Sequence, residues 1–228
     1  MVGFNATVTL PQNLKPNWLG GWSIWLRADL GITTSTGVSA WKDVTTGLSL
    51  VQATGSAQPT YNSSDSSLNH FPSISSTSAS SQNLTKASFT LAQPFTIFMV
   101  GYCPAGQNAA FCGSGSSTPY FAIGGTTVAV NAGGQRTVTV SSTTVPVVMA
   151  ASVTGANGTV YGNSSTNFTG PLGVGGASFS LLEVFAITGV AYYTSTIAEI
   201  IIYPFACTQA QVSSNFSYLG MRYNQSWS

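Results

Sequence analysis

The chain has 228 residues, of which 5% are charged, whereas about 25% are charged in an ordinary soluble domain. Its net charge of +1 offers no basic surface for nucleic acid and none for an anionic membrane. No apolar run approaches the roughly 20 residues that span a bilayer. The surface is therefore expected to be nearly neutral and rich in hydroxyl and amide groups, with little charge repulsion between copies. This composition favours an assembled or extracellular protein.

Residues 1–20 are predicted to form an extended N-terminal arm, and residues 21–228 a single domain. The first letters, MVGFNATVTLPQNLKPNW, lack the basic stretch and apolar run of a signal peptide. No repeat or interdomain linker interrupts the remainder, and its length is ample for a sizeable core.

Short runs rich in β-branched and aromatic residues, separated by Gly, Pro, Asn and Ser, predict strands. In chain order they span residues 22–29, 38–43, 48–53, 94–103, 120–125, 126–133, 136–142, 146–154, 158–163, 180–187 and 197–205. Segment 94–103 is apolar on both faces and therefore predicts a central strand. Segment 136–142 alternates and is expected to pair with 126–133 across an AGG turn. Strands at this spacing predict an all-β, antiparallel jelly-roll sandwich.

One helix is predicted, at residues 208–223 near the C-terminus. Apolar residues recur from Val212 to Tyr223 at the spacing of one helical face. Thr208 and Gln211 form a T-x-x-Q capping box at its start. Because its interior contains Ser, Asn and Gly, the helix must be held by packing on the sheet; the alternative is a terminal loop. Residues 63–83 are predicted to form a long surface loop with a short strand at FPSIS.

Three stretches together resemble a known family. WSIWLRADLGI near the start is followed by VSAWKD, and the chain closes with TIAEIIIYPFACTQAQVSSNFSYLGMRYN. This order resembles the concanavalin A-like lectin/glucanase superfamily, in particular laminin-G-like domains of bacterial and phage surface proteins. The resemblance implies a jelly roll of two curved antiparallel sheets but no single function, because this fold hosts glycosidases, lectins and structural modules. Where relatives often carry F-D-G after the long loop, this chain has SISSTSAS.

The acidic residues argue against catalysis. A retaining glycosidase needs two carboxyl groups about 5–5.5 Å apart, and glucanases of this superfamily place several acids on one strand. Here the run IAEIIIYPF contains Glu199 alone, with Ile197, Ile201 and Tyr203 expected on its face, and SLLEVFAI contains Glu183 alone. The protein is therefore predicted not to be an enzyme. A degenerate glycoside hydrolase that uses both glutamates is the enzymatic alternative.

Glu199 is instead expected to be structural. An unpaired buried carboxylate is costly, so the apolar run around Glu199 predicts a cationic partner. Arg27 in WLRAD is the predicted partner, since Arg suits a bidentate ion pair.

Other cofactor and catalytic sites have few candidate residues. His70 is the single histidine and lies in SLNHFPS, without a G-x-S-x-G elbow, so a surface or loop-anchoring role is expected. Zinc is excluded by the number of ligands. Calcium is possible, with Asp43 and Asp65 as the weak candidates beside backbone carbonyls. No other cofactor is expected.

The cysteines and the glycosylation sequons leave alternatives open. Cys103 and Cys112 could form a disulfide across their loop, or, with Cys207, be three small buried apolar residues. Asn-x-Ser/Thr sequons begin at Asn5, Asn62, Asn83, Asn157, Asn163, Asn167, Asn215 and Asn224. In a secreted eukaryotic protein they would indicate glycosylation, but a chain so rich in Ser, Thr and Asn produces several by chance.

The expected function is that of a non-enzymatic virion surface protein, such as a bacteriophage capsid decoration, head-fibre or tail-fibre component. Its expected partners are capsid or fibre proteins, copies of itself and host glycans. The alternative is a secreted, lectin-like carbohydrate-binding module. A sugar site needs an exposed aromatic platform. The tyrosines that could supply one, although packing is the more common role of each, are Tyr61, Tyr120, Tyr161, Tyr192 and Tyr193.

Overall fold

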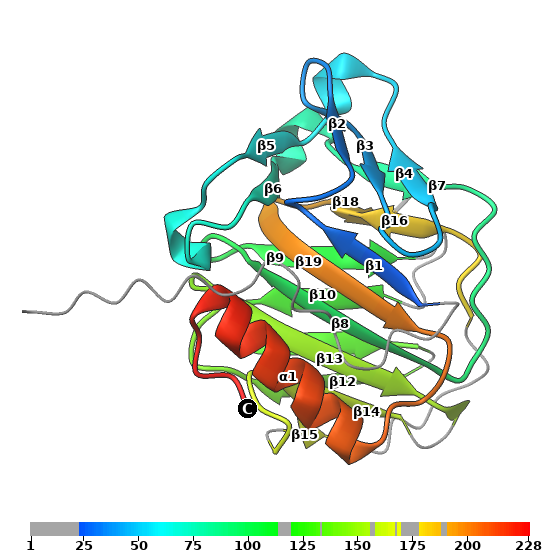
Figure 1. Cartoon of the computed structure of the whole chain (residues 1–228), viewed down its shortest axis with the longest axis vertical. Coiled ribbons are helices and arrows are strands. Elements are labelled where there is room, and N and C mark those ends of the chain that lie inside the picture. Colours follow the sequence, from blue (N-terminus) through cyan, green and yellow to red (C-terminus); the bar gives the residue numbers. More distant parts are fainter. Residues whose placement is uncertain are drawn as a thin grey trace, which may run out of the picture.

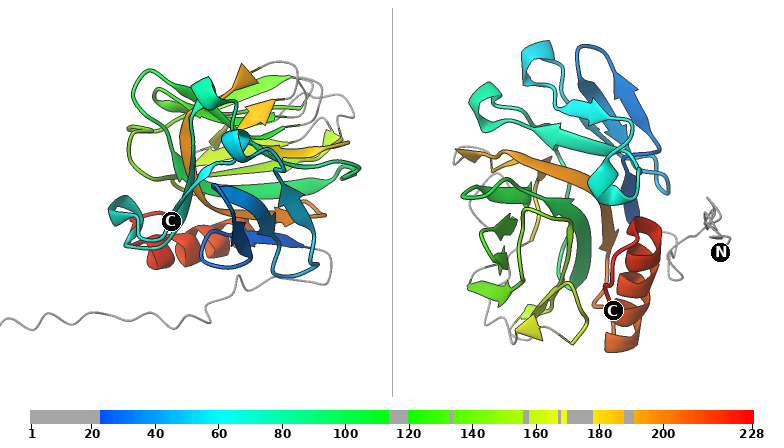
Figure 2. Two further views of the ribbon diagram at one scale, coloured as in Figure 1. Left: turned by 90° about the horizontal axis from the view of Figure 1, so that it is seen from above. Right: turned by 90° about the vertical axis from the view of Figure 1, so that its left-hand side faces the viewer.

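The computed structural model describes residues 23–113, 120–132, 134–155, 158–166, 168–169, 178–187 and 191–228. The predicted arm, residues 1–20, lies outside the described residues. Two antiparallel sheets face each other, and the C-terminal helix covers the outer face of one of them (Figures 1 and 2). The predicted all-β sandwich with one C-terminal α-helix is therefore confirmed.

We call the sheet beneath the helix sheet A; eight of the described strands form it. Its spatial order is β15 (Phe168–Thr169), β14 (Thr159–Gly162), β13 (Val147–Val153), β8 (Phe95–Tyr102), β19 (Ser195–Tyr203), β6 (Ser73–Ser76) and β5 (Thr60–Asn62), with β1 (Ile24–Arg27) also paired to β19. β8 lies between β13 and β19 and is buried along its length up to Gly101. The predicted central strand is thus confirmed.

Sheet B is the opposite layer, with nine strands among the described residues. Its spatial order is β12 (Gln135–Thr139), β11 (Thr127–Asn131), β10 (Tyr120–Gly124), β9 (Asn108–Gly113), β16 (Leu182–Val184), β7 (Leu84–Lys86), β4 (Ser49–Val51), β3 (Val38–Lys42) and β2 (Ile32–Thr34). The predicted hairpin is confirmed, since β11 and β12 pair with Asn131 opposite Gln135. A small separate ribbon joins β17 (Ala186–Ile187) to β18 (Ala191–Tyr192).

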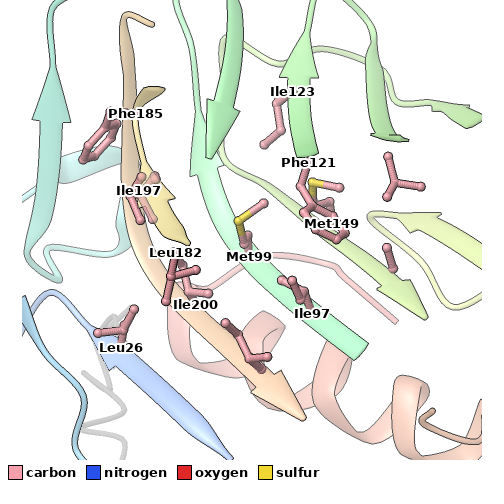
Figure 3. Close-up of a cluster of buried hydrophobic side chains, with 14 of the residues drawn as sticks. Leu26, Ile97, Met99, Phe121, Ile123, Met149, Leu182, Phe185, Ile197 and Ile200 are labelled. Atoms are coloured by element: carbon pink, nitrogen blue, oxygen red, sulfur yellow. The ribbon is translucent and has the colours of Figure 1, made fainter. Parts of the chain in front are cut away.

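The main core fills the space between the sheets, as Figure 3 shows in part. Alternate residues of each strand point inward, as the pleat requires. Sheet A contributes Ile97, Met99, Met149, Ile197 and Ile200, and sheet B contributes Phe121, Ile123 and Leu182. Because this interior is continuous and apolar, the polar residues that could carry function lie on the outer faces, the edges and the loops.

The helix α1 (Gln209–Tyr223) begins with the predicted capping box, in which Thr208 and Gln211 bond reciprocally. Its apolar stripe, including Phe216, forms a second core with the outer face of sheet A, where Phe98 and Tyr203 contact one another. Among the described residues, no helix has the length and apolar character needed to cross a membrane. Three short 3-10 helices, η1 (Gly55–Ala57), η2 (Ser66–Leu68) and η3 (Ser78–Ser80), interrupt the loops.

Candidate functional site

The position of Glu199 depends on a β-bulge in strand β19. The register between β19 and β8 shifts between Ile197 and Glu199. A bulge inserts one unpaired residue and changes which face the following side chains occupy. As a result Ile197 lies in the core between the sheets, while Ile201 and Tyr203 belong to the cluster under α1. The expectation that Ile197 shares the face of Glu199 was therefore wrong.

Glu199 is 1% exposed and fully engaged by its neighbours. Its Oε1 accepts hydrogen bonds from Trp25 Nε1 at 2.6 Å and the Tyr218 hydroxyl at 2.9 Å. Its Oε2 accepts one from the Tyr223 hydroxyl at 2.8 Å and lies 3.0 Å from Arg222 Nε. These contacts join β1, β19 and α1 through one carboxylate.

The ion-pair partner of Glu199 is Arg222, not the predicted Arg27. Arg27 does stand opposite Glu199 in the β1–β19 register. Its guanidinium, however, makes a bidentate pair with Asp29, with Nε 3.0 Å from Oδ1 and Nη2 2.6 Å from Oδ2. Arg222 also reaches Asp29, its Nη2 lying 2.8 Å from Oδ2. Two arginines and two carboxylates therefore form one cluster, which we call the charge clamp: Arg27, Asp29, Glu199 and Arg222.

The tyrosines around Glu199 remain protonated donors. Burial, followed by the charge of Glu199, raises the pKa of Tyr218 and of Tyr223 far above the usual range. Burial alone would lower the pKa of Arg222, but the charge of Glu199 together with the interactions of Tyr223, Tyr218 and Asp29 outweighs it, so the pKa is raised. Tyr218, Tyr223 and Arg222 therefore keep their protons at ordinary pH, which suits a structural joint better than proton transfer.

Glu183 lies on the other side of the molecule from Glu199. Its neighbours Leu182 and Val184 point into the main core, so Glu183 points to the outer face of sheet B. Its Oε1 accepts a hydrogen bond from Asn83 Nδ2 at 2.8 Å, and it is 1% exposed. Since packed sheets are about 10 Å apart, two glutamates on opposite outer faces cannot reach the roughly 5–5.5 Å separation of a retaining pair.

Asp43 caps a turn. Its Oδ1 accepts from the Trp25 backbone N–H and from Thr45 Oγ1, the latter at 2.7 Å. Its Oδ2 accepts from the hydroxyl and backbone N–H of Thr46, at 2.6 and 2.5 Å, and from the Gly47 N–H at 3.1 Å. Lone pairs that already accept hydrogen bonds are not directed at a cation, so the geometry of this calcium candidate is that of a turn cap.

Asp65 makes a separate network with three donors. The Ser67 backbone N–H bonds to its Oδ1 at 3.0 Å, and the hydroxyls of Ser73 and Tyr102 bond to its Oδ2 at 2.8 Å each. Burial and the hydrogen bond to Asp65 raise the pKa of Tyr102 to about 12. Within the described part of the chain, no three His, Cys, Asp or Glu side chains form a group that could hold a metal ion.

His70 and the cysteines show no catalytic arrangement in the described residues. His70 is exposed, and its Nδ1 lies 3.2 Å from Ser64 Oγ, in keeping with the predicted loop-anchoring role. Cys103 is buried and free, and Cys207 is partly buried and free. Burial raises the pKa of both thiols. The side chain of Cys112 lies outside the described residues.

Two polar hollows adjoin strand β5 of sheet A, and sequence reasoning did not locate them. One hollow of about 490 Å³ is lined by residues 61–66 and Tyr102. Another, of about 440 Å³, is lined by the β2–β3 turn, η1, β5 and Gln82. Tyr61 belongs to the lining of both hollows, and its ring packs against the main core between the sheets. We call the two hollows together the β5 groove. From the sequence, Tyr61 was one of several candidate aromatic residues. Its position in the edge strand β5, beside the β2–β3 turn, follows from the strand order, which local sequence patterns do not give.

A third hollow, of about 660 Å³, lies along β4 and β7 and is lined by residues 46–49, Val51 and residues 85–87. None of these residues is aromatic. Sugar rings are commonly bound on aromatic side chains that supply apolar area beside hydrogen-bonding groups. The β5 groove, with its tyrosines, hydroxyls and amides, is therefore the stronger candidate for a ligand site.

The comparisons with known proteins identify the fold alone. No protein-family model matches the sequence, and no curated protein matches it. An arabinofuranosidase complexed with arabinofuranosyl-α-1,2-xylobiose has a TM-score of 0.58 at 9% identity, over 82% of this chain and 51% of its own. Trypanosoma rangeli sialidase has a TM-score of 0.55 at 11% identity, over 89% and 33% respectively. The receptor-binding domain of botulinum neurotoxin type G has 0.54 at 11%, over 85% and 50%. The chain thus spans between 33% and 51% of the length of these three proteins.

Proposed function

We propose that the protein is a non-catalytic glycan-binding module with a concanavalin A-like, laminin-G-like jelly roll. The observation that carries this proposal is the β5 groove, where Tyr61 and Tyr102 stand among hydroxyl and amide groups. Ligand sites of small molecules commonly have volumes of about 300–1,000 Å³, and both hollows fall in this range. The similar folds of an arabinofuranosidase, a sialidase and a toxin receptor-binding domain support the proposal as precedents for this architecture.

The described acidic side chains support binding without turnover. Glu199 is enclosed in the charge clamp, and Glu183 is buried on the opposite face. Asp43 and Asp65 each accept several hydrogen bonds from their own loops. A degenerate hydrolase would need one of these carboxylates, so hydrolysis of β-glucans that is lost in Glu199→Gln or Glu183→Gln variants of normal stability would overturn the non-enzymatic assignment.

The experiment for the function is a glycan array probed with the protein in multivalent form. Wild-type protein is expected to bind uncharged glycans, and Tyr61→Leu is expected to abolish that binding while retaining the packing of Tyr61 on the core. Tyr192→Leu is the matched control, because Tyr192 is exposed and does not line the groove. An array without hits, or equal binding by the Tyr61→Leu protein, would contradict the proposal.

The position of this module on a virion surface is a finer proposal. A chain with only 5% charged residues has little charge repulsion between copies, which supports close assembly as a bacteriophage capsid decoration or fibre component. The protein should then copurify with particles, and its recovery only in the soluble fraction of a lysate would contradict this placement.

A secreted lectin-like module is the alternative setting. Glycosylation would support it, but the Asn215 sequon cannot take part in the folded protein. Asn215 is 1% exposed, accepts a hydrogen bond from the Tyr203 hydroxyl at 2.8 Å and donates one to the Gln211 carbonyl at 2.8 Å. Expression in a secreting eukaryotic cell, followed by peptide mapping of the remaining sequons, separates the two settings.

A further inference from the structure

We infer that Oδ1 of Asn62 is the acceptor for a hydroxyl group of a neutral sugar, and that Asp65 is the positioning residue that turns this oxygen toward the ligand. Both residues line the hollow of about 490 Å³ that also contains Tyr102. This inference rests on the proposed function and adds the atom that binds the sugar and the chemical group that this atom requires. The observation that carries it is a hydrogen-bond network whose donors lead from Asn62 to Asp65.

The network lies on the outer face of sheet A. Ile74 of β6 points into the main core, so its neighbours Ser73 and Ser75 point outward. Asn62 of β5 also points outward, because its neighbour Tyr61 packs against that core. Asn62 stands opposite Ser73 in the β5–β6 register, so their polar side chains are adjacent.

The carboxylate of Asp65 fixes the direction of these hydrogen bonds. An ionised carboxylate can only accept, so the hydroxyls of Ser73 and Tyr102, each 2.8 Å from Asp65 Oδ2, must donate to it. The single hydroxyl hydrogen of Ser73 is then used, so the Asn62 atom 3.2 Å from Ser73 Oγ must itself be a donor. The amide of Asn62 therefore turns its Nδ2 toward Ser73.

The second hydrogen of Asn62 Nδ2 joins the same network by another route. It bonds Ser75 Oγ at 2.8 Å, and Ser75 Oγ lies 2.9 Å from Thr196 Oγ1. Because Ser75 accepts from Asn62, its own hydrogen is available for Thr196. Thr196 stands opposite Tyr102 in the β19–β8 register, and a side-chain hydrogen bond joins the two. Both routes thus end at Asp65, to which Tyr102 donates.

Asn62 Oδ1 is the atom of this network that is left to bind a ligand. Both hydrogens of Nδ2 are used, and no donor in the described parts of the chain bonds Oδ1. Asn62 is partly exposed, and Oδ1 is not one of the described side-chain atoms that are buried without a partner, so solvent reaches it. A group that donates to Oδ1 would extend a chain of hydrogen bonds, and the members of such a chain strengthen one another.

The hollow therefore favours a ligand with a free hydroxyl group. A sugar hydroxyl can donate to Asn62 Oδ1 and also accept from a serine, and the exposed Ser63 and Ser66 line the same hollow. Carboxylate and sulfate groups cannot donate, and no Lys, Arg or His of the described chain lines the hollow to bind them. An ammonium group is not required, since the oxygens of Asp65 already accept three hydrogen bonds.

The test is a titration of the full chain, followed by NMR, with the methyl glycosides of glucose, galactose, mannose and xylose. A sugar that binds is compared with its monodeoxy and monodeoxyfluoro derivatives, one hydroxyl position at a time. Fluorine occupies the place of the hydroxyl oxygen but carries no hydrogen to donate. At one position both derivatives are expected to bind about tenfold or more weakly, equivalent to about 1.4 kcal/mol.

Asn62→Ala removes the acceptor. It is expected to weaken binding of the parent sugar by about tenfold or more, and to remove the difference between that sugar and the sensitive deoxyfluoro derivative. Thr137→Ala, on the exposed edge of β12, is the control and should bind like the wild type. The melting temperature of each variant shows whether it is folded.

Asp65→Asn tests the positioning role. Asparagine caps a helix as well as aspartate does, so the cap of η2 is kept. A carboxamide both donates and accepts, however, so the direction of the network is no longer fixed. This variant should bind the parent sugar and its deoxyfluoro derivative more nearly alike, a change that a purely structural role of Asp65 would not produce. Undiminished discrimination in a folded Asp65→Asn protein would overturn that role.

The outcomes separate this inference from the function on which it rests. If none of the four glycosides binds, or if fluorine restores the affinity lost in the deoxy derivative at each position, the inference is overturned, while hits on the glycan array would leave the glycan-binding function standing. Tighter binding of glucosamine than of glucose would overturn the assignment to neutral sugars. If the glycan array also has no hits, both proposals fail.

Discussion

Arg222 and Glu199 form an ion pair across the interface between α1 and β19, with Arg222 Nε 3.0 Å from Glu199 Oε2. Their side chains are 5% and 0% exposed. Arg222 also lies over the ring of Phe71, 4.1 Å from its centroid, and reaches Asp29 after β1. Through these contacts Arg222 connects the helix α1 to strand β19, to the end of β1 and to the loop around Phe71 that follows η2.

Removal of Glu199 should destabilise the protein strongly. Glu199→Ala leaves Arg222 with one carboxylate and leaves the hydroxyls of Tyr218 and Tyr223 without their acceptor. Breaking a buried pair typically costs about 3–5 kcal/mol, and this loss is expected in urea unfolding at neutral pH. Thr137→Ala, on the exposed edge of β12, should change the free energy of unfolding by less than about 0.5 kcal/mol. A loss under about 1 kcal/mol for Glu199→Ala, as at a surface pair, would contradict the clamp.

Double-mutant cycles should distinguish the two arginines. Glu199→Gln combined with Arg222→Met is expected to show a coupling energy of about 1–3 kcal/mol, because the two side chains are in contact. Glu199→Gln combined with Arg27→Met should show a smaller coupling, since the ion-pair partner of Arg27 is Asp29. Equal coupling energies would mean that Arg27 and Arg222 interact equally strongly with Glu199 in solution.

The stability of the protein should fall in acid because of Asp29 and Asp43. Burial raises the pKa of Asp29, but the hydrogen bonds from Arg27 and Arg222 and the charges of both arginines together outweigh it, so the pKa is lowered. Burial also raises the pKa of Asp43, but the hydrogen bonds from Thr46, Trp25 and Thr45 together outweigh burial, so this pKa is lowered as well. A folded-state pKa below the unfolded value of about 3.9 gives stability that is complete above that pH and lost as pH falls through the folded pKa.

The measurement is urea unfolding at a series of pH values for wild type and for Asp29→Asn. Wild-type stability should be nearly level between about pH 5 and 7 and decline below about pH 4. The difference between the two proteins should shrink as the carboxyl group of Asp29 becomes protonated. A difference that stays constant down to the acid limit would show that the charge of Asp29 contributes no stability.

Gly220→Ala should destabilise α1 although alanine is the better helix former. Propensity alone predicts a gain of about 0.8–1.0 kcal/mol. The chain after the helix folds back, however, and a Cβ at Gly220 would stand 2.9 Å from the carbonyl oxygens of Gln225 and Trp227. A lower melting temperature is therefore expected, and a higher one would mean that the C-terminal residues do not pack on the helix in solution.

The sequence predicted the long elements well. The apolar run of β8, the alternation of β12 and the capping box of α1 are local signals, and each element lies within a few residues of its predicted bounds. Strands β2, β5, β7, β15 and β18, of two or three residues each, were missed, and so was the longer β9, which occupies part of the stretch between Cys103 and Cys112 that was expected to be a loop. Three residues carry too little periodicity to identify a strand, and their pairing depends on neighbours distant in sequence.

The candidate site depended on features that local patterns do not encode. The need for a cation beside Glu199 was predictable from burial, but the choice of Arg222 follows from the β19 bulge and the docking of α1. The separation of Glu199 from Glu183 follows from their placement on different sheets. The β5 groove forms where a strand edge meets the β2–β3 turn, so Tyr61 could be named only as one aromatic residue among several.

Hydrogen–deuterium exchange, with and without a glycan that binds on the array, tests the glycan-binding account most directly. Protection is expected in residues 34–37 and 60–66, which line or adjoin the β5 groove, and it should be lost in Tyr61→Leu. Protection confined to residues 46–49 and 85–87, the hollow along β4 and β7, would place the ligand elsewhere and contradict the account.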